Sequence, residues 1–192
     1  MLYQIVSLVL ELVVGFVSGA CLLRLYMQIQ RIPMGLRSGN PLGQLVFAVT
    51  DWIVLPLRRW LPAMGPVDTA SLVAAYLLAL LDFGLLWLLA GAAGGLFAVP
   101  ILAAFGLLRL SITGITGLVI VYAILSWVPT HSNITQLLDR LVAPLLRPIR
   151  RLLPLIGGID LSPLVLLLLL QVVGIVLGAV QATVLVALAS SI

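Results

Sequence analysis

The sequence predicts an all-α membrane protein with four transmembrane helices, built from two parallel tandem repeats of span, amphipathic interfacial helix and span. Three observations predict this class. Hydrophobic residues make up 63% of the 192 residues and charged residues 8%, with a mean hydropathy of +1.30, whereas soluble domains have about 25% charged residues. The apolar residues form four long runs, and the second half of the chain repeats the first. A chain this short cannot bury so much apolar surface in its own core, so we expect lipid to cover it.

The four apolar runs are long enough to cross a bilayer, because about 20 apolar residues span about 30 Å of hydrocarbon. They cover residues 2–28, 69–90, 96–128 and 161–189. The first run lacks the basic start and the short apolar core of a signal peptide, so we expect no cleavage. The third run is long enough to tilt or to kink near Pro100. An even number of spans places both termini on one side of the membrane.

Two amphipathic segments, residues 40–62 and 133–154, separate the spans of each half. In the second segment seven apolar side chains fall on one helical face, and polar side chains lie elsewhere. They are Ile134, Leu137, Leu138, Leu141, Leu145, Ile149 and Leu152. Pro144 and Pro148 should break or kink this helix, because each lacks an amide donor. We expect the segment to lie in the plane of the lipid headgroups.

The arginines predict the orientation of the chain. Each long loop carries four of the ten arginines, and the chain contains no lysine. The loop arginines are Arg31, Arg37, Arg58 and Arg59 in the first loop and Arg140, Arg147, Arg150 and Arg151 in the second. The termini and the turn at residues 91–95 carry none, so the positive-inside rule places both loops in the cytoplasm and both termini outside. The net charge of +4 therefore reflects orientation, and without interleaved aromatic residues we expect no nucleic acid partner.

An internal repeat appears when the chain is shifted by 92 residues. Residues 56–62 (PLRRWLP) then align with residues 148–154 (PIRRLLP), and eleven of the 30 positions from Gln44 to Val73 are identical. The identities include Gly65 with Gly157 and Asp68 with Asp160. A biased composition explains matched leucines but not matched Arg-Arg, Pro, Gly and Asp. We therefore expect a tandem duplication, with repeat 1 at residues 1–95 and repeat 2 at residues 96–192.

The second copy carries a longer motif. It reads LSWVP at residues 125–129, PLLRPIRRLLP at residues 144–154 and IGGIDLSP at residues 156–163. These segments resemble the signature of the YggT (YlmG) family, and two copies over nearly the whole chain resemble its two-repeat bacterial form. The first copy departs from the pattern, with AMGPVDTAS at residues 63–71, so a role of that motif would rest on the second copy.

The resemblance implies a small multi-pass protein of the bacterial inner membrane. With the orientation given above, both termini would be periplasmic and the arginine-rich loops cytoplasmic. Members of the family are linked to osmotic or ion homeostasis, to cell division and nucleoid organisation, and in plastid relatives to cytochrome assembly.

The turn before the fourth span holds residues suited to a helix start. They are Gly157, Gly158, Asp160, Ser162 and Pro163. Asp160 or Ser162 can accept the amide hydrogens of the first turn, where Pro163 is also favourable. Asp68 would do the same in the first copy. An alternative interpretation makes Asp68 and Asp160 a paired cation site at the cytoplasmic mouth.

Three ionisable residues lie near the middle of spans at a similar depth. They are Glu11, Asp82 and Arg109. A charge at mid-bilayer costs at least about 2.5–3.5 kcal/mol unless it is paired or hydrated, so we expect Arg109 to pair with Asp82, Glu11 or both. Arg24, near the end of the first span, should instead extend to the cytoplasmic interface. The three mid-depth residues form either a buried ionic staple or a proton or cation relay.

Five loop arginines are candidates for binding the headgroups of anionic lipids or an acidic segment of a membrane-protein partner. They are Arg58, Arg59, Arg147, Arg150 and Arg151. The alternative is that they act only as determinants of topology.

Two pairs of glycines spaced four apart permit close helix packing. They are Gly15 with Gly19 on the first span and Gly174 with Gly178 on the fourth. We expect them to pack within the chain rather than between chains.

No motif of a known catalytic or cofactor-binding site is present. The sequence lacks a nucleophile elbow, a phosphate-binding loop and HExxH, and it contains one cysteine, Cys21, and one histidine, His131. We therefore expect no enzymatic activity, no cofactor and no metal. The first functional hypothesis is a non-enzymatic membrane protein that supports ion or osmotic homeostasis, as a small conduit or as an accessory to a transporter. The alternative is a scaffold or assembly factor that recruits partners through the amphipathic loops.

Overall fold

The protein is all-helical in the part of the chain that the structure describes. This computed structural model describes residues 2–35, 40–61, 67–89, 91, 95–126, 133–152 and 160–190. The helices are α1 (Leu2–Ile29), α2 (Pro41–Arg58), α3 (Thr69–Leu89), α4 (Ala98–Ser126), α5 (Asn133–Leu152) and α6 (Ser162–Ser190). Among them α1, α3, α4 and α6 are long and apolar enough to cross a membrane. The predicted fold class is confirmed, and the predicted spans match these helices to within two residues at each end.

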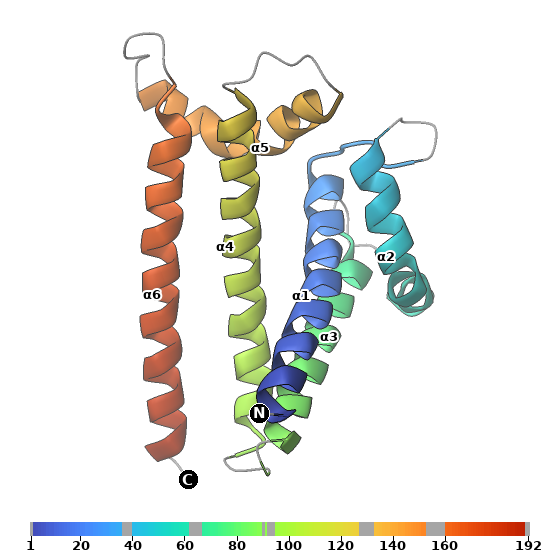
Figure 1. Cartoon of the computed structure of the whole chain (residues 1–192), viewed down its shortest axis with the longest axis vertical. Coiled ribbons are helices and arrows are strands. Elements are labelled where there is room, and N and C mark those ends of the chain that lie inside the picture. Colours follow the sequence, from blue (N-terminus) through green and yellow to red (C-terminus); the bar gives the residue numbers. More distant parts are fainter. Residues whose placement is uncertain are drawn as a thin grey trace.

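The two halves have the same orientation. In Figure 1, α1 and α4 run in one direction and α3 and α6 in the other. Helix α1 packs on α3, α4 packs on α6, and contacts of α3 with α4 join the halves. Both termini lie at one end of the bundle, which we call the terminal end. The opposite end, where α5 lies, is called the loop end.

The two amphipathic helices are placed differently. Helix α5 lies across the ends of α4 and α6, as expected for a helix in the headgroup plane, whereas α2 descends along α1 and α3 (Figure 1). The difference follows from their composition, because α5 carries four arginines and α2 carries one, Arg58, in its last turn. Helix α2 is therefore apolar enough to lie against the spans.

Of the two outcomes predicted for Pro144 and Pro148, a break or a kink, the structure shows the kink: α5 continues through both prolines, and its path is bent (Figure 1). Each proline removes one backbone donor, while the buried side chains of Leu141 and Leu146 hold both sides of the bend against the bundle. The hydroxyl of Tyr26 on α1 donates to the carbonyl of Leu141 at 2.7 Å. That carbonyl lies three residues before Pro144, where a proline loosens the helix.

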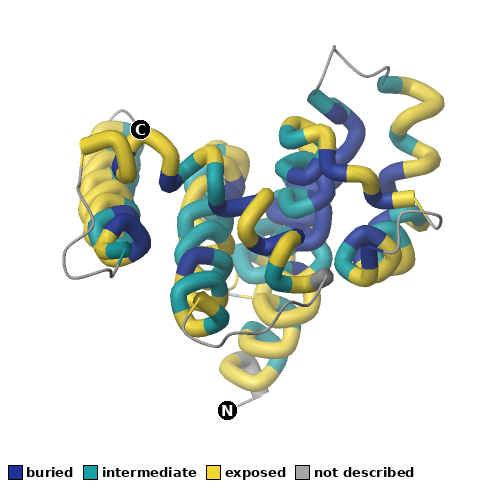
Figure 2. Tube along the Cα trace, turned by 90° about the horizontal axis from the view of Figure 1, so that it is seen from above, coloured by how far each residue is buried: buried dark blue, intermediate teal, exposed yellow. Residues whose placement is uncertain are grey.

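The core is denser in the N-terminal half. In their most apolar windows, α1 and α3 have 22% of residues buried, whereas α4 and α6 have 11%, and Figure 2 shows α6 as largely exposed. Close approach in the first half depends on Gly43, because a Cβ there would lie 2.8 Å from the Cα of Met34. The second half therefore leaves more apolar surface for lipid or for another protein to cover.

The two predicted glycine pairs do not pack within the chain. A Cβ added at Gly15, Gly19, Gly174 or Gly178 would meet no atom within 4 Å, so the expectation of intrachain packing is wrong. Helix α1 contributes Val14 and Cys21 to the core instead. Helix α6 contributes Leu166.

Candidate functional site

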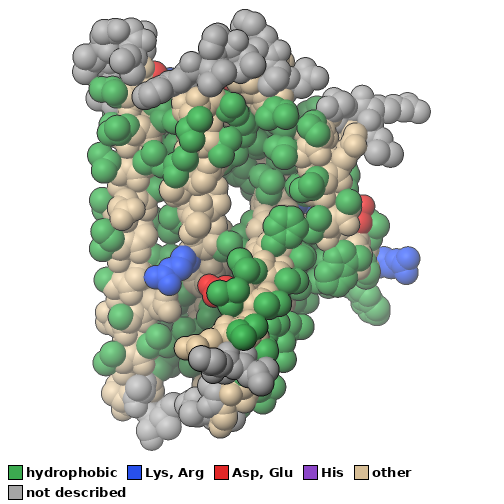
Figure 3. All heavy atoms as spheres, viewed as in Figure 1, with side chains coloured by type: hydrophobic (Ala, Val, Ile, Leu, Met, Phe, Trp, Pro, Cys, Tyr) green, Lys and Arg blue, Asp and Glu red, His purple; other side chains and the backbone are tan. Residues whose placement is uncertain are grey.

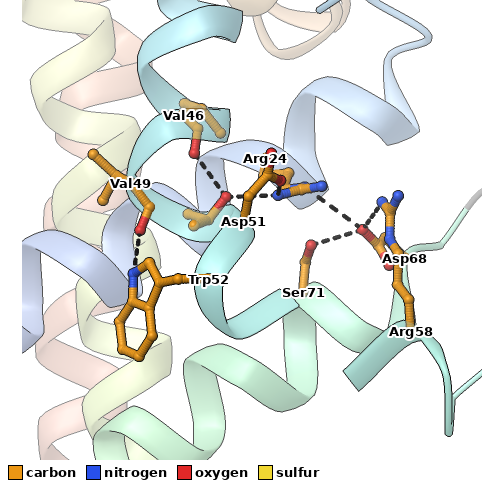
Figure 4. A network of polar contacts seen from close by, with 9 residues as sticks. Arg24, Val46, Val49, Asp51, Trp52, Arg58, Asp68 and Ser71 are labelled. Carbon is orange, nitrogen blue, oxygen red and sulfur yellow. Dashed lines mark hydrogen bonds and ion pairs between the residues drawn. The ribbon is translucent and has the colours of Figure 1, made fainter. Parts of the chain in front are cut away.

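A buried arginine holds α1 and α2 together. Arg24 is 1% exposed, and its Nη1 donates to Thr50 Oγ1 and Asp51 Oδ1 on α2, both at 2.7 Å (Figure 4). Its guanidinium carbon lies 4.7 Å from the centroid of the Phe47 ring, which is cation–π distance. The expectation that Arg24 extends to the interface is therefore wrong. Asp51 on the neighbouring helix α2 compensates the charge of Arg24 inside the bundle. The periodicity of the sequence could not predict this contact, because periodicity does not show which helices meet.

Asp68, directly before α3, connects three helices. Its side chain is 3% exposed, and Oδ2 accepts hydrogen bonds from Arg58 on α2 and from Ser71 Oγ on α3 (Figure 4). The Nε of Arg24 on α1 lies 3.9 Å from the same oxygen. Burial alone would raise the pKa of Asp68, but the hydrogen bonds from Arg58 and Ser71 outweigh it and hold the pKa below its usual value.

The second repeat contains the same ion pair 92 residues later. Arg150 Nε donates to Asp160 Oδ2 at 2.8 Å, and the amide of Ser162 donates to Asp160 Oδ1 at 2.9 Å. Asp160 thus accepts an amide hydrogen of the first turn of α6, as its position in the sequence indicated. Burial would raise its pKa, but hydrogen bonds from Ser162 and Arg150 lower it. Because each aspartate is bound by its own arginine, neither is free to serve a paired cation site.

The two ion pairs differ in what surrounds them. In repeat 2 the hydroxyl of Tyr122 on α4 accepts from Arg150 at 2.9 Å and donates to Asp139 Oδ1 at 3.3 Å. Tyr122 thus connects the first span of its repeat to the amphipathic helix, as Arg24 does in repeat 1. Asp160 is 28% exposed and Asp68 3%, so the first pair is the more deeply desolvated.

The candidate loop arginines fall into two groups. Arg58 and Arg150 are bound by aspartates, whereas Arg59, Arg147 and Arg151 are exposed and are absent from the ion pairs of the described residues. The motif turn is only partly described, because Gly157 and Gly158 lie outside the described residues. Ser162 and Pro163 are buried at the start of α6.

Sequence reasoning missed one member of the exposed group. Arg140 is also exposed on α5, and its spacing from Arg147 and Arg151 is seven and eleven residues. At 3.6 residues per turn these three side chains lie on one helical face. We call Arg140, Arg147 and Arg151 the arginine stripe; the spacing alone would have revealed it.

The structure does not pair the three mid-depth charges. Glu11 and Arg109 are exposed and Asp82 is half-buried, and the ion pairs among described residues include none of them. Asp82 Oδ1 is buried without a hydrogen-bond partner in the described part of the chain. The expected ion pair is missing because Arg109 faces a groove between α4 and α6.

This groove has a volume of about 470 Å³. Four polar side chains line it among apolar residues and glycines: Arg109, Thr113, Thr116 and Gln171. Figure 3 shows a basic side chain between α4 and α6 and an acidic one between α4 and α1 at a similar height.

Comparison with known proteins gives the family. The CCB3/YggT family model matches residues 3–89 and again residues 101–181. The chain belongs to the CCB3/YggT family. It is 42% identical over 184 residues to "Uncharacterized protein YggT" of Escherichia coli (strain K12), covering 92% of each chain. An uncharacterized protein of Vibrio alginolyticus is 39% identical over 144 residues, covering 72% of this chain and 77% of its own length. No solved structure matches.

Each of the two family-model matches contains the arginine–aspartate pair that lies at the same place in both repeats, Arg58–Asp68 in the first and Arg150–Asp160 in the second. The pair is thus a feature of both repeats of this CCB3/YggT chain, and it joins the amphipathic helix to the following span. The relatives are named as uncharacterized and no activity is attached to them.

The ion pairs predict a pH-dependent loss of stability. Asp68→Asn should destabilise the protein by about 3 kcal/mol or more at pH 7, because it leaves buried Arg24 and exposed Arg58 without their shared carboxylate. Asp160→Asn, at a more exposed pair, should cost about 1 kcal/mol. A carboxyl group whose pKa is lower in the folded state stabilises the folded protein at pH values above its unfolded-state pKa, which is near 4. The difference between wild type and Asp68→Asn should therefore shrink as the pH falls through 4 toward the folded-state pKa.

Thermal unfolding in detergent between pH 3 and pH 7 measures these differences. Asp139→Asn, which removes an exposed carboxylate with a single long hydrogen bond, is the matched control. Equal effects of the Asp68 and Asp139 substitutions at pH 7 would contradict the assignment.

Proposed function

We propose that the protein is a non-enzymatic scaffold of the bacterial inner membrane, whose loop end binds the headgroups of anionic lipids. In this way it would support ion and osmotic homeostasis as an accessory to a transporter. The observation that carries the proposal is the arginine stripe of α5. Its three side chains are exposed, while the opposite face of the helix is buried through Leu141, Leu146 and Ile149.

The position of α5 suits this role. It lies across the ends of two spans (Figure 1), where an amphipathic helix meets the headgroup region. The Arg150–Asp160 pair fixes α5 to the start of α6, so the stripe is held in place before lipid binds. Each basic residue near an anionic surface contributes about 1 kcal/mol. The stripe would then contribute about 3 kcal/mol, or about a hundredfold in affinity.

An accessory role fits one chain better than conduction does. Glu11 and Arg109, two of the three mid-depth charges, are exposed, and Arg109 lines an open groove rather than an enclosed path. A conduit within one chain would need such groups to face an enclosed path between the helices. The specific observation in favour of a conduit is the groove with Arg109, Thr113 and Gln171 at mid-span.

The first prediction for this function concerns lipid binding. The triple substitution Arg140→Gln, Arg147→Gln and Arg151→Gln should weaken binding of phosphatidylglycerol about a hundredfold and leave binding of phosphatidylcholine unchanged. Native mass spectrometry of the purified chain with each added lipid measures both. Arg109→Gln removes an exposed arginine away from the loop end and serves as the control. Equal phosphatidylglycerol binding by wild type and triple variant would refute the proposal.

The second prediction concerns orientation. In a Cys21→Ser background, a cysteine at Arg140→Cys should react with a membrane-impermeant maleimide only after the inner membrane is permeabilised. A cysteine at Ser190→Cys should react from the periplasm, because both termini would lie there. Reversed labelling of the two sites would place the stripe on the outer face.

The third prediction separates the accessory from the conduit. Purified chain in liposomes should add no K⁺ or Na⁺ flux to that of protein-free liposomes. Flux that Asp82→Asn abolishes, while Asp139→Asn preserves it, would establish the conduit and overturn the accessory role.

A further inference from the structure

We propose that the groove between α4 and α6 is a docking surface for a second copy of this chain, in which Arg109 of one copy pairs with Glu11 of the other. The inference goes beyond headgroup binding by α5 and does not depend on it. It rests on the unpaired charges at mid-span, on the open glycines beside them and on the relative positions of the two charges.

Arg109 and Glu11 lie at a similar depth in their helices. Arg109 lies eleven residues into α4 and Glu11 nine residues into α1, both counted from the terminal end. At 1.5 Å per residue both lie about 14–17 Å along their helices, which is near the middle of about 30 Å of hydrocarbon. From that depth an arginine side chain cannot place its charge fully in the headgroup region. Charged groups at this depth pair with one another or face water.

Neither charge has an ion-pair partner among the described residues of its own chain. Arg109 and Glu11 are both exposed. A neighbouring carboxylate, Asp82, has a buried oxygen without a hydrogen-bond partner in the same described part. The chain thus presents a cation and an acidic site to its surroundings at one depth. The two are complementary in charge.

The surface around Arg109 permits the close approach of another helix. Gly174 and Gly178 line the groove, and Gly114 and Gly117 lie exposed on α4. No atom lies within 4 Å of the Cβ position of any of the four. Small residues let the backbones of membrane helices come together, and no side chain of the described residues fills that space.

A twofold symmetric dimer can pair the two charges. On the face shown in Figure 3, a basic side chain lies between α4 and α6 and an acidic one between α4 and α1, at a similar height. A twofold axis along the membrane normal, passing between two such sites, places each basic group opposite the acidic group of the other copy. The interface is then isologous and closes as a dimer. Each dimer contains two Arg109–Glu11 pairs.

Charge reversal in trans tests this arrangement. Arg109→Glu alone and Glu11→Arg alone each place like charges opposite one another in a homodimer. When the two variants are co-expressed, both interfacial pairs are opposite in charge again. Within one chain neither variant regains an opposite pair, so rescue on mixing reports contacts between copies.

The experiment uses full-length chains with two different affinity tags, extracted in native lipid discs. Wild-type copies should co-purify, each reversed variant should co-purify at least about tenfold less with itself, and the mixed variants should recover. Arg59→Glu makes the same charge change at the loop end and should leave co-purification unchanged. Gly178→Leu should also weaken co-purification, because the larger side chain fills the groove. No atom of the described chain lies within 4 Å of the Cβ position at this glycine, and the variant changes no charge.

Two results would overturn the inference: wild-type chains that do not co-purify, or reversed variants that co-purify as well as wild type. The inference would also be overturned if the mixed variants did not recover co-purification although thermal unfolding showed each variant to be folded. Phosphatidylglycerol binding measured on the same samples reports the loop-end function separately, so a monomeric chain that still binds lipid removes only this inference.

Discussion

The carboxylates of Asp68 and Asp160 each hold an arginine of the preceding amphipathic helix against the first turn of a membrane span. This contact solves a local electrostatic problem, because the end of an amphipathic helix carries basic residues and the span that follows tolerates almost no charge. The ion pair neutralises both groups where the chain turns into the apolar layer. The placement of α2 and α5, and with it the shape of the loop end, depends on these two contacts.

The two repeats contain the same arginine–aspartate pair in different surroundings. In repeat 1 a second arginine, Arg24, is buried beside the pair and reaches Thr50 and Asp51, which draws α2 down along the spans. In repeat 2 a neutral hydroxyl, Tyr122, takes the connecting position, and α5 stays across the helix ends. The first repeat is thereby the more tightly packed half, while the second exposes the arginine stripe and the groove. After the duplication, repeat 1 thus forms the packed part of the bundle, and repeat 2 carries the exposed surfaces.

Much of the fold follows from local sequence. The spans could be predicted to within two residues, because apolar runs end where glycine, proline and arginine gather, and a cap residue such as Asp160 marks a helix start. The surroundings of Arg24 could not be predicted, since Asp51 and Asp68 are 27 and 44 residues away and periodicity says nothing about which helices meet. The mid-depth residues could be predicted as unusual because a charge is costly in lipid. The direction in which Arg109 faces could not be predicted, because it depends on which helices meet. The glycine pairs indicated close packing without indicating whether the neighbour belongs to the same chain.

The arginine stripe has a consequence that follows from its chemistry. The chain contains no lysine, so every cation on α5 is a guanidinium, which stays protonated at any physiological pH and is not a substrate for lysine acetylation. The proposed attraction of this helix to an anionic surface would therefore be insensitive to proton concentration and to lysine acetylation. What does alter it is the ionic strength of the adjoining solution, because the Debye length falls from about 10 Å at 0.1 M salt to about 3 Å at 1 M. In the proposed lipid-binding role, the affinity of the loop end for the membrane surface would therefore fall as the salt concentration of the adjoining solution rises.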